Sequence, residues 1–310
     1  MTTARKPRRW KRAMVHRRRA VAVFIGVLIP LASRSWANAQ NQEAEFRNIA
    51  KAMWVWRTDP DEYLELLEFA TRWNIRNVAV SMRPAHIDRL LSGDETIMRS
   101  LSALRSAGVA ITALAGEAHW VLDGRIPKFL AKLIDLSEQF DLFDGLHFDV
   151  EPHTLDAWAV GGPSRDALMR GFLDLLKRTR HTAPALRLSA AINPVYAELT
   201  LPDGRNFLDA VAGALNSVSV MAYRNQPERT VEWVGSTGSL LERANVPWWN
   251  GVLVHQSKDK NTSYDGVTSD RFVTDMVRLH RLLSGRFGVY RSYRGLMFED
   301  YKGLRRALEV

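Results

Sequence analysis

The stretch that decides the fold of this chain reads Asp144-Gly145-Leu146-His147-Phe148-Asp149-Val150-Glu151-Pro152. Side chains of a β-strand alternate between its two faces. One face of this strand is therefore wholly apolar, with Leu, Phe and Val, and the other carries His147, Asp149 and Glu151. We expect the apolar face to pack against surrounding helices and the ionisable face to point into a closed sheet.

This strand is the fourth of eight short β-rich runs, and amphipathic helical runs separate them. The predicted strands are 52–57, 77–82, 110–114, 145–151, 187–192, 217–223, 252–255 and 295–299. The predicted helices are 61–73, 95–107, 128–140, 165–180, 206–215, 230–244 and 270–284, and an eighth begins over 304–308. Eight β–α repeats in about 250 residues have the size of a TIM barrel.

The competing fold is an open doubly wound sheet, whose first turn often carries a glycine-rich phosphate loop. Here the first predicted strand runs into Arg57-Thr58-Asp59-Pro60, which contains no glycine. We therefore predict an α/β fold, a (β/α)8 TIM barrel over residues 51–310.

Asp149 and Glu151 fall at the C-terminal end of the predicted fourth strand, where TIM barrels build their active sites. Ionisable groups inside a barrel are costly unless they are paired and used. The two carboxylates lie about 6–7 Å apart at their backbones, so their charges interact and raise the pKa of one of them. A protonated acid beside an ionised partner suits cleavage of a glycosidic bond. Two alternatives remain: with His147 they form a network that only stabilises the barrel, or they bind a metal ion.

The same residues resemble the DGxDxDxE pattern of the fourth strand in family 18 glycoside hydrolases, the chitinase-like barrels. Asp144, Gly145, Asp149 and Glu151 match that pattern. The resemblance implies that Glu151 is the general acid. It also implies that Asp149 orients the 2-acetamido group of the substrate as that group attacks the anomeric carbon. Asp144 and His147, from the same motif, are placed with the catalytic residues.

A second motif supports the first. Residues 217–223 end in Met221-Ala222-Tyr223, which resembles the Met-x-Tyr end of the sixth strand in the same family. Gly295-Leu296-Met297 also follows the family pattern in the eighth strand. The resemblance implies that Tyr223 helps to hold the reacting acetamido group. An ordinary tyrosine at the barrel rim is the alternative.

The chain departs from the family pattern at three positions. His147 replaces the middle aspartate, and a histidine there is expected to donate a hydrogen bond to Asp149 or to carry its charge. Arg224 follows Tyr223 where the family usually has an aspartate, and Glu299 stands where the family has the tryptophan under the sugar. These departures argue against the usual N-acetylglucosamine site, so the identity of the sugar stays open.

Glu299 offers a second catalytic carboxylate. At the end of the last predicted strand it is expected to face Glu151 across the barrel mouth, where it acts as nucleophile or base. The alternative is an ion pair at the rim with Arg291 or Arg294. Several residues near strand ends are candidate substrate contacts, or else packing and capping residues of the barrel: Trp56, Arg83, Asn193, Met221, His255 and Glu299.

Residues 1–39 have the three parts of a secretory signal peptide. A basic run ends at Arg19, an apolar run covers 20–32, and Ala37-Asn38-Ala39 is a cleavage pattern. The apolar run is shorter than the roughly 20 residues of a membrane span, which favours a cleaved signal peptide. An uncleaved anchor is the alternative. Translation from Met14 gives the peptide ordinary proportions.

We predict cleavage after Ala39, a linker over residues 40–50 and an exported protein, periplasmic or secreted, without stable membrane insertion. The formal charge is +9, and the ten Lys and Arg residues of 1–39 leave residues 40–310 with −1. This balance argues against nucleic-acid binding. The chain has no cysteine, which excludes disulfides, cysteine-bound zinc and a cysteine nucleophile.

The predicted function is hydrolysis of a polysaccharide or oligosaccharide, with Glu151 as general acid and Asp149 as its partner. No cofactor and no metal are predicted, and a glycan is the predicted partner. Two alternatives are kept: a catalytically inactive, polysaccharide-binding barrel of a surface or export system, and a metal-dependent hydrolase. The sequence leaves the linkage, endo or exo action and the oligomeric state open.

Overall fold

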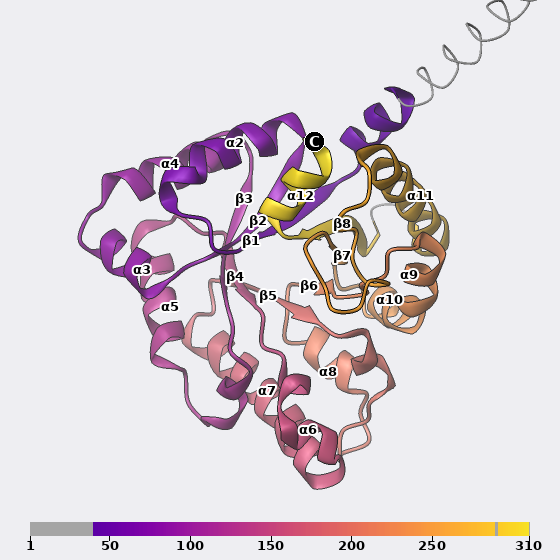
Figure 1. Cartoon of the computed structure of the whole chain (residues 1–310). Helices are drawn as coiled ribbons and strands as arrows, with labels where there is room; N and C mark the ends of the chain where they lie inside the picture. The colour runs from indigo at the N-terminus through magenta and orange to yellow at the C-terminus, as the bar shows by residue number, and fades with distance from the viewer. Residues whose placement is uncertain (1–39, 289–290, 310) are drawn as a thin grey trace, which may run out of the picture. The chain divides into compact units, whose positions relative to one another are not determined.

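The computed structural model describes residues 40–288 and 291–309, and it divides the chain into two units, residues 1–46 and 47–310 (Figure 1). The predicted signal peptide and its cleavage site lie outside the described residues. Of the first unit, residues 40–46 are described and are helical, within the stretch predicted as a linker. The second unit holds the barrel.

Eight parallel strands form a closed barrel in chain order, and β1 pairs with β8 to close it (Figure 1). This confirms the predicted (β/α)8 TIM barrel. The strands are β1 (Lys51–Val55), β2 (Ile75–Ser81), β3 (Ala110–Ala115), β4 (Gly145–Phe148), β5 (Arg187–Ile192), β6 (Ser217–Val220), β7 (Trp248–Leu253) and β8 (Tyr293–Glu299).

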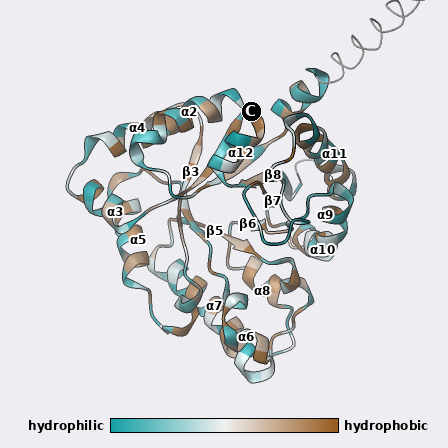
Figure 2. Cartoon of the chain, viewed as in Figure 1, coloured by the Kyte–Doolittle hydropathy of each residue, from teal (hydrophilic) through white to brown (hydrophobic). Residues whose placement is uncertain are grey.

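Helices follow the strands. Short 3₁₀ helices lie at η1 (Pro60–Glu62), η2 (Ala118–Leu122), η3 (Pro152–Thr154) and η4 (Pro194–Glu198). The α-helices are α2 (Tyr63–Arg72), α3 (Pro84–Leu91), α4 (Glu95–Ser106), α5 (Lys128–Phe140), α6 (Asp156–Val160), α7 (Gly162–Thr182), α8 (Phe207–Ala212), α9 (Pro227–Trp233), α10 (Gly235–Arg243), α11 (Ser269–Phe287) and α12 (Tyr301–Leu308). Figure 2 shows hydrophilic and hydrophobic residues together on helices such as α4 and α11, as expected where one side packs on a barrel. Within 40–288 and 291–309, no helix is long and apolar enough to cross a membrane.

The inside of the barrel combines one large side chain with several small ones. Trp54 is fully buried there and packs among alanines, so that a wide indole fills the space that short side chains leave. The interior cluster comprises Ala52, Trp54, Ala79, Leu114, Ala191 and Met297, with Trp56, Met221 and Trp249 packed against it. The alternation predicted for the fourth strand is confirmed: its Leu, Phe and Val are buried, and His147 joins Trp54 in the interior.

Several elements differ from the sequence-based expectation. The fourth and sixth strands each end three residues before the predicted bounds, and the predicted helix 230–244 is divided into α9 and α10. The seventh strand starts at Trp248, before the predicted 252–255, and includes Gly251. A Cβ atom at Gly251 would lie 2.8 Å from the Val220 carbonyl oxygen and 2.9 Å from the Tyr223 ring, so the close packing of β6 on β7 requires glycine. The helix α3 is an addition to the predicted elements, and it begins with a proline in its first turn.

Candidate active site

Asp149 and Glu151 lie directly after β4, at the mouth of the barrel. The Asp149 amide donates to the Ala115 carbonyl oxygen at 3.1 Å, which continues the pairing with β3 for one more residue. Gly116 makes this approach possible, because a Cβ atom there would lie 2.2 Å from the backbone carbonyl of Asp149. The position of Asp149 is therefore fixed by the neighbouring strand.

Asp149 is a largely buried carboxyl group with a strongly raised pKa. Burial is the main cause, and the charges of Glu151 and Glu299 add to it; together they raise the pKa of Asp149 to about 8. The predicted interaction between neighbouring carboxylates is thus present, and it favours the protonated form of Asp149 at neutral pH. Because Glu299 contributes, the ends of the fourth and eighth strands face a common space.

His147 is buried below this group and does not serve Asp149. Its Nε2 atom accepts a hydrogen bond from the Trp54 indole at 3.0 Å, so the ring proton lies on Nδ1. Nδ1 donates to the Ser189 hydroxyl at 2.8 Å, and that hydroxyl donates to the Leu146 carbonyl oxygen at 3.2 Å. Burial lowers the pKa of His147 to about 3.

The expectation that His147 donates to Asp149 or carries a charge is therefore wrong. Both ring nitrogens are used inside the barrel, and the ring stays neutral. The same geometry removes His147 from the candidate metal ligands. Among the described residues, no group of three or more His, Cys, Asp or Glu side chains is arranged to hold a metal ion.

Glu151 has a partner that the sequence did not predict. His153 Nε2 lies 3.1 Å from a carboxylate oxygen of Glu151, and its Nδ1 lies 3.0 Å from the buried hydroxyl of Tyr196. Asn193 approaches the same Nε2 atom at 3.2 Å, and its own amide oxygen accepts from the Val195 amide. Asn193, a predicted substrate contact, thus lies in the Glu151 network. His153 lies in η3, where strand alternation no longer applies, so no local pattern marked it.

Glu299 is held by two side chains from the segments that follow β6 and β7. The Tyr223 hydroxyl donates to one carboxylate oxygen, and His255 Nε2 lies 3.5 Å from the other. Glu299 is the main cause of a raised pKa at His255. In the part of the chain that the structure describes, Glu299 forms no ion pair with Arg291 or Arg294. Tyr223, His255 and Glu299 therefore lie together at the barrel mouth.

Asp144 lies at the opposite end of β4 from this group. Its carboxylate accepts from the Ile111 amide at 2.7 Å and from Arg105 at 3.4 Å, and its own amide donates to the Ile111 carbonyl oxygen at 2.6 Å. Asp144 joins β3 to the start of β4. We correct its assignment as a catalytic residue, because the length of the strand separates it from Glu151.

Three predicted substrate contacts lie around the barrel in different settings. Trp56 and Met221 are partly buried and pack against the interior cluster. Arg83 is half-exposed at the start of α3, where its guanidinium contacts Asp59 and His86. Arg83 therefore links the loops after β1 and β2, and nothing places it with Glu151.

Compared by sequence, the chain matches no family model and no curated protein. Its structure is similar to a GH18 chitinase from Pseudoalteromonas aurantia, with a TM-score of 0.49 and 12% identity over 84% of this chain and 100% of that chain. It is also similar to a protein described as an alpha-L-fucosidase from Bacteroides thetaiotaomicron, with a TM-score of 0.52 and 9% identity over 84% of this chain and 94% of that one. A third similar structure is described as a deoxyribose-phosphate aldolase from Toxoplasma gondii, with a TM-score of 0.51 and 11% identity over 86% of this chain and 93% of that one.

The chain shares the TIM-barrel fold of these structures. Identities this low show the fold alone, and an aldolase shares it, so the reaction has to be argued from the side chains at the mouth.

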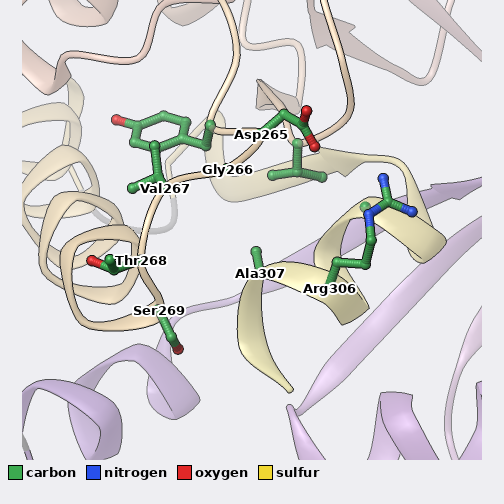
Figure 3. Close-up of a pocket in the computed structure, with 10 residues that line it drawn as sticks. Asp265, Gly266, Val267, Thr268, Ser269, Arg306 and Ala307 are labelled. Atoms are coloured by element: carbon green, nitrogen blue, oxygen red, sulfur yellow. The ribbon is translucent and has the colours of Figure 1, made fainter. Parts of the chain in front are cut away.

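A separate cavity of about 550 Å³ lies between the loop before α11 and the helix α12. Figure 3 shows Asp265 to Ser269 on one side of it and Arg306 and Ala307 on the other. None of the mouth carboxylates lines this cavity. We therefore place the candidate chemistry at the barrel mouth.

Proposed function

We propose that this protein is an exported glycoside hydrolase in which Glu151 is the general acid and Asp149 its partner. One observation carries the proposal. Asp149, with its pKa raised to about 8, lies two residues from Glu151 at the C-terminal mouth of a closed barrel. A protonated and an ionisable carboxyl group side by side supply what cleavage of a glycosidic bond requires.

In the proposed reaction, the bond between the anomeric carbon and the glycosidic oxygen breaks, and Glu151 gives its proton to that oxygen. His153 contacts the Glu151 carboxylate and is able to exchange a proton with it, while Tyr196 fixes the other side of the imidazole ring. Protonated Asp149 has a hydrogen to donate to the substrate or to Glu151. Water later completes the hydrolysis and returns a proton to the active site.

Two groups are candidates for the attack on the anomeric carbon. By the family resemblance, the acetamido oxygen of the substrate attacks and Asp149 stabilises the cyclised intermediate. The contacts of Glu299 favour a second route, because a carboxylate held by Tyr223 and His255 is oriented as a nucleophile should be.

Substrate chemistry separates these routes. Attack by the acetamido group requires 2-acetamido sugars and predicts inhibition by a thiazoline analogue of the intermediate. Attack by Glu299 predicts turnover of plain hexosides and a covalent glycosyl adduct on Glu299, detected by mass spectrometry.

Export belongs to the proposal and rests on the sequence of residues 1–39. Protein recovered from the producing cells is expected to begin at Gln40, as measured by N-terminal sequencing. An intact Met1 or Met14 in a membrane fraction contradicts export with cleavage.

The hydrolase proposal is tested by a panel of oligosaccharides and polysaccharides with reducing-sugar release as the readout. On any glycan that the protein cleaves, Glu151→Gln should lower kcat by about 10²–10⁴-fold, since the amide keeps the shape but delivers no proton. Binding should persist in the variant. Glu138→Gln, at an exposed carboxylate of α5, is the matched control and should leave kcat unchanged.

Two outcomes contradict the proposal. Turnover by Glu151→Gln at near wild-type rate removes Glu151 from the chemistry. Saturable binding of glycans without release of sugar by any member of the panel favours the inactive, polysaccharide-binding barrel.

A further inference from the structure

Two arginines without acidic partners lie beside the candidate active site. Arg224 directly follows Tyr223, whose hydroxyl holds Glu299. Arg229 is exposed on α9, one turn further along the chain. Within the described ranges, neither arginine forms an ion pair with a carboxylate, although the nearby Glu228 does pair with Arg278 at 2.6 Å. The two guanidinium charges are therefore left uncompensated by an ion pair.

Both arginines line a cavity of about 350 Å³ between the loops that follow β6 and β7. Its lining comprises Arg224, Asn225, Gln226, Arg229, Asp259 and Asn261. Asn225 ties the two loops together: its amide donates to the Asn261 carbonyl oxygen at 2.9 Å, and its side chain donates to the carbonyl oxygens of Lys260 and Ser263 at 2.7 and 3.1 Å. Hydrogen bonds between the two loops therefore fix the shape of the cavity.

Arg224 is held in this hollow by contacts that leave its charge in place. Its Nη1 atom donates to the Tyr223 carbonyl oxygen at 2.6 Å, and its guanidinium lies 4.8 Å from the ring centre of Trp233. A stacked guanidinium keeps further N–H donors in its plane. These donors suit an anionic group that enters the cavity.

The surroundings strengthen the positive charge. Asp259 is the one acidic residue in the cavity lining, and exposed Lys258 and Lys260 flank it. Residues 40–310 carry a formal charge of −1 overall, whereas the cavity lining has two arginines and one acid. The cavity is formed by the loops after β6 and β7, at the same end of the barrel as Glu151 and Glu299.

We propose that this cavity binds an anionic substituent of the substrate, so that the glycan cleaved at the mouth is an acidic one. This inference rests on the proposed hydrolase function and names its substrate class. A carboxylate, sulfate or phosphate on a sugar near the cleaved bond pairs with the guanidinium groups of Arg224 and Arg229. Asn225 of the cavity lining donates to the Ser263 carbonyl oxygen at 3.1 Å, and the Ser263 hydroxyl donates to the His255 carbonyl oxygen, so the cavity adjoins the loop that carries His255 at the barrel mouth. The aspartate that the family usually has in place of Arg224 repels such a group.

The test measures binding, because binding does not depend on turnover. The full chain with Glu151→Gln is titrated calorimetrically with three probes: an unsulfated chondroitin hexasaccharide, its carboxyl methyl ester and chondroitin 4-sulfate hexasaccharide. All three have the same backbone of 2-acetamido sugars and uronic acids; the ester masks the carboxylates with methyl groups, and the 4-sulfate adds sulfate groups. We expect the acidic probes to bind more tightly than the ester, with a preference that declines in salt.

Variants of the two arginines test whether these residues cause the tighter binding of the acidic probes. Arg224→Gln and Arg229→Gln should each weaken binding of the acidic probes by about fivefold and leave binding of the ester unchanged. Arg224→Lys keeps the charge and should retain most of the affinity. Arg99→Gln, at an exposed arginine of α4 that contacts only its own helix, is the matched control and should change nothing.

The three probes distinguish a site for a carboxylate from a site for a sulfate. A carboxylate site distinguishes the unsulfated acid from its ester, whereas a sulfate site responds only to the 4-sulfate. Equal affinity for all three probes, no binding of any of them, or loss of affinity for the ester as well in Arg224→Gln overturns the inference. If the preference is found but no glycan is ever cleaved, the anion site stands and the hydrolase proposal fails. If the protein cleaves a neutral glycan and shows no preference for the acidic probes, the hydrolase proposal stands and the anion site fails.

Discussion

The hydroxyl group of Tyr223 donates a hydrogen bond to the carboxylate of Glu299, which joins the end of the sixth strand to the end of the eighth. His255, from the loop after the seventh strand, approaches the other carboxylate oxygen at 3.5 Å. In the absence of substrate the Tyr223 hydroxyl is therefore directed at Glu299. This makes Tyr223 a positioning residue for Glu299, whereas the family resemblance assigns it to the acetamido group.

Tyr223→Phe removes one hydrogen bond from a charged acceptor. We expect kcat on a confirmed substrate to fall by about 10–100-fold, since a hydrogen bond to a charged group is worth about 1.5–3 kcal/mol. In a Glu299→Gln background the same change should add little, because both variants disturb one contact. Additive losses in the double variant show instead that Tyr223 acts on the substrate independently of Glu299.

Asp149→Asn should change the pH dependence of stability. The pKa of Asp149 is raised from 3.8 to about 8, so between these values the folded protein holds a proton that the unfolded chain releases. The stability of the wild type therefore declines as pH rises through this window, at most by about 1.4 kcal/mol for each pH unit. The variant lacks this decline and should be the more stable protein at pH 8 by a few kcal/mol.

Urea unfolding at pH 5, 7 and 9 measures the difference. In activity assays the wild type should show an alkaline limb near pH 8 that belongs to the coupled carboxyl groups and disappears in Asp149→Asn. A constant stability difference between the two proteins at all three pH values contradicts the assignment of the raised pKa.

His153→Ala should uncouple Glu151 from Tyr196. We expect kcat to fall by about tenfold with little change in KM, because the contact of His153 Nε2 with the Glu151 carboxylate is lost while the substrate contacts remain. The pH profile of kcat should move as well, which a purely structural role does not produce. His153→Gln, which keeps a donor near Glu151, should recover part of the rate, and His119→Ala, at an exposed histidine of η2, is the control.

His147→Leu tests the buried network under the active site. The variant leaves the indole N–H of Trp54 without its acceptor and the hydroxyl of Ser189 without its donor, which should cost about 2–4 kcal/mol of stability at pH 7. The pKa of His147 is lowered from 6.5 to about 3, so the unfolded chain gains a proton in this window that the folded protein excludes. Wild-type stability is therefore lost as pH falls from about 6.5 towards 3.

The leucine variant has no such proton, so its stability deficit should shrink steadily on acidification. Urea titrations at pH 7, 5 and 4 measure this trend. A deficit of constant size at the three pH values shows that His147 is not a neutral, buried imidazole.

The fold was predictable from sequence because its evidence is local and repeated. Strand alternation at 145–151, β-rich runs separated by amphipathic helices, and the position of Asp149 and Glu151 at a strand end are all read from residues close together in the chain. These features defined the barrel, the buried apolar face of β4 and the mouth carboxylates. They misplaced the seventh strand, which begins at Trp248 and not at residue 252.

Partnerships between side chains were decided by the tertiary structure alone. Closing the sheet brings Trp54 and Ser189 onto His147, and Tyr223 and His255 onto Glu299, over separations that no local pattern records. The same closure pairs Asp144 with the Ile111 amide and Arg105, and it leaves Arg224 beside a cavity. Sequence determined which ionisable groups point into the barrel, since alternation is a property of each strand. Only the folded chain decided which of them bear charge, because burial and neighbouring charges set the pKa of each group.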